Sequence, residues 1–151
     1  MIDTKQAVRT AYYQLLNGHL TYTPPGTANT VNCPVSDSVE KLADDYDAYV
    51  IMMNQDSTPS NTNNSWNTIE HITLDIFYKG TRVSKSVVDN IYLQIKTLLF
   101  SAPNQPVNLP VQPGCVIQNV VKDQDGYIIF KSINANYVTR RVITFSQLVT
   151  E

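Results

Sequence analysis

The stretch Thr68-Ile-Glu-His-Ile-Thr-Leu-Asp-Ile-Phe-Tyr78 decides the fold of this chain. Its apolar residues alternate with polar ones, which is the pattern of a β-strand that buries one of its two faces. Because successive side chains point to opposite faces, the buried face is expected to carry Ile72, Leu74, Ile76 and Tyr78. The wetter face is expected to carry His71, Thr73, Asp75 and Phe77.

The strand continues through Gly80 into an amphipathic helix over residues 84–100. Apolar residues repeat there at helical spacing: Val87, Val88, Ile91, Tyr92, Ile95, Leu98 and Leu99. The strand spans roughly 35 Å at ~3.4 Å per residue, and the helix about 25 Å at ~1.5 Å per residue. Something else must therefore shelter the far end of the strand, and a neighbouring subunit is one candidate.

An earlier helix is predicted over residues 4–17. Asp3 followed by Gln6 resembles a capping box, and Gly18 stands where a left-handed C-cap belongs. Between the helices we expect a short edge strand at 31–35, a helical turn near 38–42 and a buried strand at 48–54. Residues 55–67, rich in Asn, Ser and Thr, are expected to form a long polar loop.

The rest of the chain predicts three more strands after a proline-rich connection at 102–114. A strand at 115–122 is expected to turn back at 123–126 into a strand at 127–131. A turn at 134–136 then leads into a last strand at 137–148. The order α-β-β-β-α-β-β-β predicts a single α+β domain over 1–151, with both helices on one face of a mainly antiparallel sheet.

The composition excludes several classes of partner. A net charge of −2 gives no basic field for nucleic acid, and only 16% of residues are charged. The longest apolar run, at 48–53, is far too short to span a bilayer, so no membrane partner is expected. Cys33 and Cys115 are interpreted as free thiols, with a disulfide as the alternative.

Chemical motifs are sparse, and we predict no catalytic residue, cofactor or metal. Asp44, Asp45 and Asp47 are interpreted as a solvated loop, and Asp123-Gln-Asp-Gly126 as a turn, although both have the carboxylates that Ca²⁺ prefers. The alternative of an enzyme centres on His71 and Asp75, which share a strand face. That enzyme would need a concave pocket formed with the 102–114 segment.

The candidate subunit-interface residues are Trp66, Phe77, Asp75, Arg82, Arg140 and Arg141. Aromatic residues are enriched at interface cores, although loops of the same domain could also cover Trp66 and Phe77. Arg140 and Arg141 face opposite ways on a strand and so cannot form one patch. Each pairs either with an acidic neighbour in its own chain or across a subunit contact.

The succession of these elements resembles the small tail-terminator and tail-completion proteins of tailed bacteriophages. The resemblance covers nearly the whole chain in pattern. It is carried by the helices at 4–17 and 84–100, the strands at 48–54 and 68–78 with Gly80, the entry Tyr46-Asp-Ala-Tyr-Val-Ile51, and the closing strands through 140–148. The proline-rich stretch 102–114 is longer than in the simplest members.

The resemblance implies a virion protein, assembled in the bacterial cytoplasm, that forms a homo-oligomeric ring, hexamer or dodecamer, at the head–tail junction or tail end. Its partners would be other neck, tail or portal proteins, with DNA only passing through the lumen. No catalytic residue is carried over from this family. The alternatives are a small α+β binding module and, less favoured, an enzyme.

Overall fold

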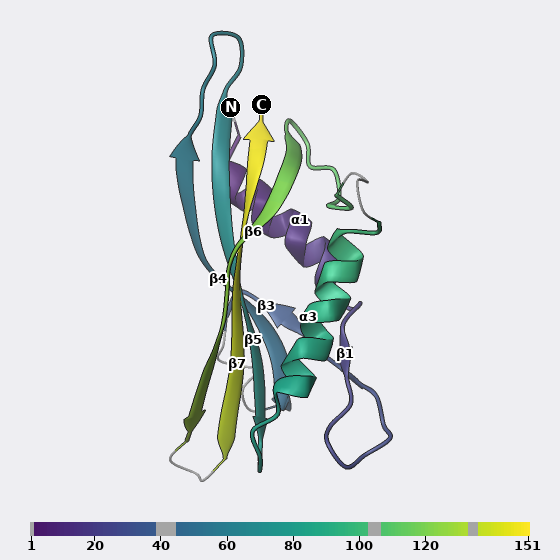
Figure 1. Ribbon diagram of the computed structural model, residues 1–151. Helices are drawn as coiled ribbons and strands as arrows, with labels where there is room; N and C mark the ends of the chain where they lie inside the picture. The colour runs from purple at the N-terminus through teal and green to yellow at the C-terminus, as the bar shows by residue number, and fades with distance from the viewer. Residues whose placement is uncertain (1, 39–44, 103–106, 133–135) are drawn as a thin grey trace.

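The computed structural model describes residues 2–38, 45–102, 107–132 and 136–151. Within them, two helices lie on the same side of a tall, twisted sheet (Figure 1). This sheet has five strands in the order β3-β4-β5-β7-β6. The predicted α+β class, with both helices on one face of a mainly antiparallel sheet, is confirmed.

Four long strands form the sheet: β4 (Ala48–Pro59), β5 (Asn67–Gly80), β7 (Tyr137–Thr150) and β6 (Val116–Lys131). Each is antiparallel to its neighbour. A short fifth strand, β3 (Val35–Ser36), runs parallel to the beginning of β4. The sheet therefore has two outer edges, one formed by β3 and β4 and the other by β6.

The two helices begin and end close to where the sequence predicts. Helix α1 (Thr4–Leu16) is capped by Asp3, whose carboxylate accepts a hydrogen bond from the Gln6 amide at 3.1 Å. Gly18 follows the helix with a φ of 80°, which glycine adopts without steric cost. Helix α3 (Lys85–Leu99) starts after Ser84, although the Ser84 side chain makes no capping hydrogen bond.

A second, two-stranded sheet lies beside α3. Strands β1 (Thr21–Tyr22) and β2 (Val31–Asn32) are antiparallel, and the Pro-Pro-Gly turn lies between them. Gln94 of α3 accepts a hydrogen bond from the Thr21 amide at 2.9 Å and donates one to the Thr21 carbonyl at 2.8 Å. The edge strand expected at 31–35 is thus two short strands in two different sheets, broken before Pro34.

The core lies between the helices and the sheet, and the predicted faces of β5 are confirmed. Its buried side chains Ile72, Leu74, Ile76 and Tyr78 pack in one apolar cluster with residues of both helices. Helix α1, and not a neighbouring subunit, shelters the end of β5 that α3 does not reach: the α1 residue Tyr12 packs on Phe145 of β7 with ring centroids 6.2 Å apart. The expectation that something other than α3 shelters this end is therefore confirmed, and the candidate of a neighbouring subunit is not needed for it.

Buried polar groups fix α1 on the sheet. The Tyr12 hydroxyl donates to the Gln147 side chain at 2.8 Å, and the Gln147 amide donates to the Glu70 carbonyl at 2.7 Å. The Glu70 carboxylate, also buried, accepts hydrogen bonds from the hydroxyls of Thr4 and Ser57. Because each partner is satisfied, this network specifies one position of the helix on the sheet.

The loop predicted at 55–67 is wrong over its first part. Strand β4 continues to Pro59, so that only a tight connection at 60–66 joins it to β5. Pairing with β5 overrides the weak strand propensity of Asn, Asp and Ser in this stretch. An irregularity between Met52 and Gln55 adds one residue to β4 and shifts the register.

The hairpin turn predicted at 123–126 is wrong. Strand β6 passes straight through these residues, although two irregularities in its pairing with β7 lie nearby, one between Gln118 and Val121 and one between Lys122 and Gln124. Asn119 in the first irregularity has a positive φ of 54°. The Asp-Gly signal therefore marks a disturbed stretch of strand and not a reversal. The turns predicted near 38–42 and at 134–136 fall largely outside the described residues.

Candidate assembly surfaces

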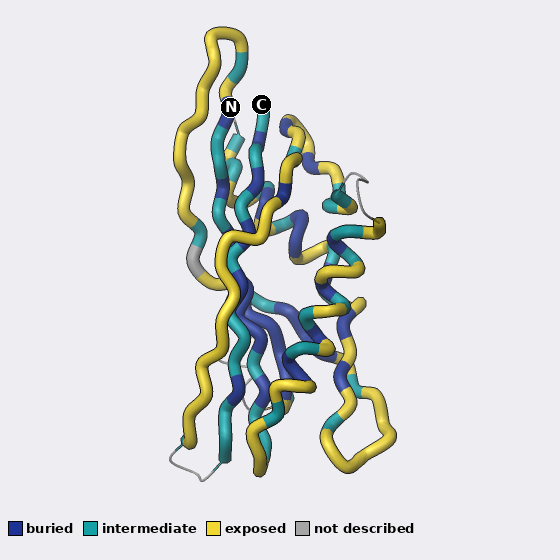
Figure 2. The backbone as a smooth tube through the Cα atoms, viewed as in Figure 1, coloured by how far each residue is buried: buried dark blue, intermediate teal, exposed yellow. Residues whose placement is uncertain are grey.

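Strand β6 forms one outer edge of the sheet, and its residues are exposed along most of its length (Figure 2). The consecutive residues Tyr127, Ile128, Ile129 and Phe130 are 41–46% exposed, which is unusual for a run of four large apolar side chains. In the part of the chain that the structure describes, no strand pairs with the outer side of β6. An exposed, apolar edge strand is a ready-made site for pairing with another chain.

The backbone of this edge is regular from Gln124 to Lys131, because each residue pairs in step with β7. The Ser132 amide donates to the Asn136 carbonyl at 2.7 Å, which fixes which residues of β6 point toward β7. Since the direction alternates along an antiparallel strand, the amides and carbonyls of Tyr127, Ile129 and Lys131 point outward.

Arg141 of β7 holds the C-terminal half of β6, residues 124–131, against α3. Its guanidinium donates to Asp125 of β6 at 2.9 and 2.7 Å and to Asp89 of α3 at 2.9 Å. It also lies 3.9 Å from the ring centroid of Tyr92 and 5.5 Å from that of Tyr127. The bidentate contact with Arg141, supported by Lys122, lowers the pKa of the Asp125 carboxyl below its usual value.

The opposite face of the sheet, which neither α1 nor α3 covers, carries a compact aromatic and ionic cluster. Arg140 donates from Nε to the buried Asp75 carboxylate at 3.2 Å and forms a second contact from Nη2. Its guanidinium lies 4.7 Å from the centroid of the Phe77 ring, which stacks on Tyr49 at 5.0 Å. The hydrogen bond to Asp75 raises the pKa of the Arg140 guanidinium.

Three predicted interface residues, Asp75, Phe77 and Arg140, are thus brought together, while Arg141 lies on the other face. The expectation that the two arginines do not share a patch is confirmed, and both pair with acids of their own chain. Phe77 is half-buried by its own domain.

The connection between β4 and β5 forms a hairpin arm, residues 53–73, that extends beyond α1 (Figure 1). Trp66 lies near its tip and is 62% exposed, so loops of the same domain do not cover it. The outer edge of the arm is polar, and Pro59 lacks an N–H there. Because the Ser60 amide donates inward to the Asn67 carbonyl at 2.8 Å, position 59 points outward, where no ladder hydrogen bond is lost.

Arg82 lies in the short connection between β5 and α3 and is exposed. It is therefore separated from Trp66 by the whole length of β5. The predicted interface residues consequently do not form a single patch: they occupy both ends of the sheet and both of its faces.

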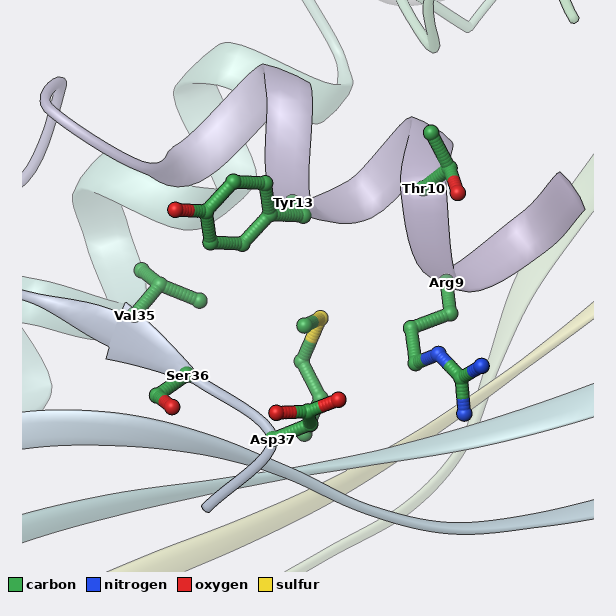
Figure 3. A pocket seen from close by; sticks show the side chains of 7 residues that line it. Arg9, Thr10, Tyr13, Val35, Ser36 and Asp37 are labelled. Atoms are coloured by element: carbon green, nitrogen blue, oxygen red, sulfur yellow. The ribbon is translucent and has the colours of Figure 1, made fainter. Parts of the chain in front are cut away.

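A cavity of about 340 Å³ opens between α1 and the β3–β4 edge. In Figure 3, Arg9 and Tyr13 reach down from α1 toward Val35, Ser36 and Asp37. Met52 of β4 completes the lining, at the point where β3 no longer covers β4. The cavity has one cationic and one anionic side chain and is open to a small polar ligand or an extended peptide.

The structure does not assemble the enzyme site considered from the sequence. The Nδ1 atom of His71 lies 3.2 Å from Asp123, while the Asp75 carboxylate is bound by Arg140. The described part of the 102–114 segment lies on the helix side, where Gln112 donates to Gln14 of α1 at 3.0 Å. His71 lies on the other face of the sheet.

Within the described ranges, no group of three or more His, Cys, Asp or Glu side chains is placed to hold a metal ion. Cys33 and Cys115 are both free and buried, as interpreted from the sequence. Burial raises the pKa of the Cys33 thiol to about 12, which makes it a poor nucleophile at neutral pH. Among the same residues, no helix has the length and apolarity needed to cross a membrane.

Sequence reasoning missed the apolar edge of β6, which is the most distinctive surface of the molecule. The signal was present in Tyr127-Ile-Ile-Phe130, four apolar residues without a charge. The sequence pattern predicts residues 127–131 as the return strand of a hairpin. Such a strand would lie between the strands at 115–122 and 137–148. Burial cannot be inferred from hydrophobicity when the order of strands in the sheet is wrong.

No protein-family model matches the chain, and no curated protein matches it. Among solved structures, the chain is similar to one in the structure described as the virion of a native gene transfer agent particle. The two align over 100% of both chains with a TM-score of 0.69 and 14% sequence identity. At this identity the similarity shows that the two chains share a fold over their full lengths.

Proposed function

We propose that this chain is a structural protein of a virion of the tailed-phage type, without catalytic activity. The observation that carries the proposal is the full-length fold similarity to a chain of a gene transfer agent virion. The uncovered strand edges also support a structural role, since such edges favour association with other chains over a monomeric state.

We further propose that the chain forms a ring, hexamer or dodecamer, at the head–tail junction or the tail end. Rings close through heterologous contacts, in which one surface of a protomer meets a different surface of the next. The hairpin arm suits one half of such a contact, because it extends away from the helices and presents Trp66. Trp is enriched among the residues that contribute most to interfaces.

The cluster on the uncovered face of the sheet suits the other half of the contact. Phe77 and Arg140 are accessible there, while Asp75 is fully buried and acts by holding Arg140 in place. Arg82, at the other end of β5, is available to a second partner such as a neck, tail or portal protein. A net charge of −2 would let DNA pass through the lumen without binding tightly.

The test is electron microscopy and native mass spectrometry of the protein mixed with its neck or tail partners. The wild-type chain is expected to form closed rings, and Trp66→Ala to lose most of them while keeping its fold. His19→Ala is the control, because His19 is exposed after α1, outside the arm, and should leave rings intact. A wild-type chain that stays monomeric with those partners present contradicts the proposal.

The second candidate function is that of a small α+β binding module, which the cavity beside α1 favours. Arg9 and Asp37 would supply opposite charges to a small zwitterionic or peptide ligand. Screening such ligands by thermal shift, with Arg9→Ala as the comparison, tests this function. A ligand that stabilises the wild type but not the variant would support it over a purely structural role.

A further inference from the structure

We propose that two copies of this chain pair through the C-terminal half of β6, residues 124–131, by adding their strands antiparallel to one another. The contact goes beyond the proposed ring: it is isologous, so it closes at two copies and does not depend on ring formation. The occupant of the exposed edge is thus a second copy of the same edge.

The segment has the geometry for strand addition. It pairs in step with β7 along its whole length, and no strand of the described residues lies beside the outward amides and carbonyls of Tyr127, Ile129 and Lys131. It contains no proline, and the irregularity between Lys122 and Gln124 ends where the segment begins. Natural edges are usually blunted by charge, proline or a bulge, and none of these lies within residues 126–130.

The sequence of the segment is complementary to itself in one antiparallel register. With Ile128 on the twofold axis, Tyr127 lies opposite Ile129 and Gly126 opposite Phe130 of the other copy. Asp125 then lies opposite Lys131, and both belong to the face of the strand that carries Tyr127. Opposite charges and apolar side chains directly across a strand pair stabilise that pair.

Neighbouring registers are worse. Moving the axis to Tyr127 places Asp125 opposite Ile129 and draws the disturbed residue Asp123 into the pair. Moving it to Ile129 places Lys131 opposite Tyr127 and leaves Asp125 beyond the end of the partner strand. Because outward-pointing residues must face outward-pointing residues, an axis between two residues is excluded.

The edge of the sheet formed by β3 and β4 is a poorer partner for the exposed edge of β6 than a second copy of β6. At the level of β6 residues 125–129, the opposite edge is β4 residues 48–52, as the pairings through β5 and β7 show. There β3 already occupies the outer side of β4 at Val50 and Ile51. Continuing the sheet from β6 of one copy to β4 of the next would therefore need an axial shift, which favours an open helix of subunits over a closed pair or ring.

Cysteine cross-linking tests the register. Ile128→Cys is expected to form a disulfide-linked dimer under mild oxidation, because residue 128 meets its own copy on the axis. Tyr127→Cys and Ile129→Cys should each form few disulfide-linked dimers when oxidised alone. A mixture of the two variants should form them readily, since residue 127 of one copy faces residue 129 of the other. The native Cys33 and Cys115 are buried, so wild-type protein treated in parallel provides the background.

Sedimentation velocity of the full chain, alone and reduced, tests the pairing itself. Wild-type protein is expected to shift from monomer to dimer as its concentration rises, and Ile128→Lys to remain monomeric because it places two ammonium groups across the axis. Circular dichroism should show that this variant keeps its fold, since Ile128 is 46% exposed. A wild-type chain that stays monomeric at every concentration, together with no cross-link at residue 128, overturns the proposal.

The outcomes separate this proposal from the ring. Rings formed with virion partners by the Ile128→Lys variant would support the ring and show that pairing is a separate contact. Cross-linking in a register other than the one centred on Ile128 would overturn the register argued above. A strand supplied by a different virion protein would be revealed by protection of β6 amides from exchange only in its presence, with no homodimer, and would overturn pairing between copies.

Discussion

The two long edges of this sheet are built from different kinds of residue. The outer edge of β4 carries polar side chains, an inserted residue and Pro59, and β3 covers its beginning. The outer edge of β6 carries four apolar side chains in a regular strand with its hydrogen-bonding groups directed outward. One edge is thus protected against pairing and the other is prepared for it, although both belong to one sheet.

The comparison shows that the tendency of an edge strand to pair with another chain is set by its individual residues and not by the fold. Both strands are held on their inner sides by antiparallel pairing over most of their length, with one irregularity in β4 and two in β6. What differs is the outward side, which contributes nothing to the core. The apolar residues on the outward side of β6 are therefore accessible for contacts outside the monomer.

The largest effect is expected from paired truncations of two phenylalanines. Phe145→Ala, in the core under Tyr12, should lower the free energy of unfolding by about 3–5 kcal/mol. Phe130→Ala, at the exposed edge, should cost less than about 1 kcal/mol. Chemical denaturation at low protein concentration measures both, and similar losses would mean that Phe130 is part of the monomer core.

A smaller loss is expected when the anchor of the β6 edge is removed. Arg141→Met keeps the packing on Tyr92 but loses the hydrogen bonds to Asp89 and Asp125, at a cost of about 2 kcal/mol. Hydrogen exchange should accelerate in residues 124–131 and stay slow in β4. Lys131→Met is the control, because Lys131 is exposed, and its exchange pattern should match the wild type. Uniform acceleration through the sheet would argue against a local anchor.

Removing the block on the opposite edge should change association more than stability. Pro59→Thr restores an outward N–H on β4, so light scattering should show increased self-association while the free energy of unfolding changes by less than about 1 kcal/mol. Thr58→Val serves as control, since the amide of residue 58 points toward β5 and the change adds no outward donor. Equal association of the two variants would show that side-chain hydrophobicity, and not the free N–H, decides the behaviour of this edge.

The smallest effect is a dependence of the β6 edge on acid. The pKa of Asp125 is lowered in the folded protein, chiefly by Arg141, so its contribution is complete above the ordinary pKa near 4 and is lost as pH falls through the lowered value. The difference in free energy of unfolding between wild type and Asp125→Asn is expected to be less than about 1 kcal/mol at neutral pH. This difference should therefore shrink on acidification. A difference that stays constant or grows toward low pH would contradict this.

The sequence predicts the parts of this molecule that obey local rules. The face of β5 and the bounds of both helices follow from apolar spacing and from caps such as Asp3 and Gly18. The separation of Arg140 from Arg141 follows from strand geometry alone. These features need no knowledge of which strand lies beside which.

The remainder depends on long-range pairing, which local signals misrepresent. Residues 55–59 have little strand propensity, yet pairing with residues 68–72 of β5 makes them strand. Asp123-Gln-Asp-Gly126 has the composition of a turn, yet pairing with β7 keeps it extended. The exposed edge at 127–130 was missed for the same reason, because only the order of strands reveals which one is outermost.

The extra residue between Met52 and Gln55 has a consequence for how this chain tolerates change. It puts Ser57 on the helix side of the sheet, where it reaches the Glu70 carboxylate. Deleting one residue there would remove the bulge and leave Ser57 opposite Glu70, whereas straightening the strand with the extra residue retained would turn Ser57 toward solvent and bring Asp56 beneath α1. A single deletion at this point should therefore be tolerated, whereas a substitution that straightens β4 without shortening it should not.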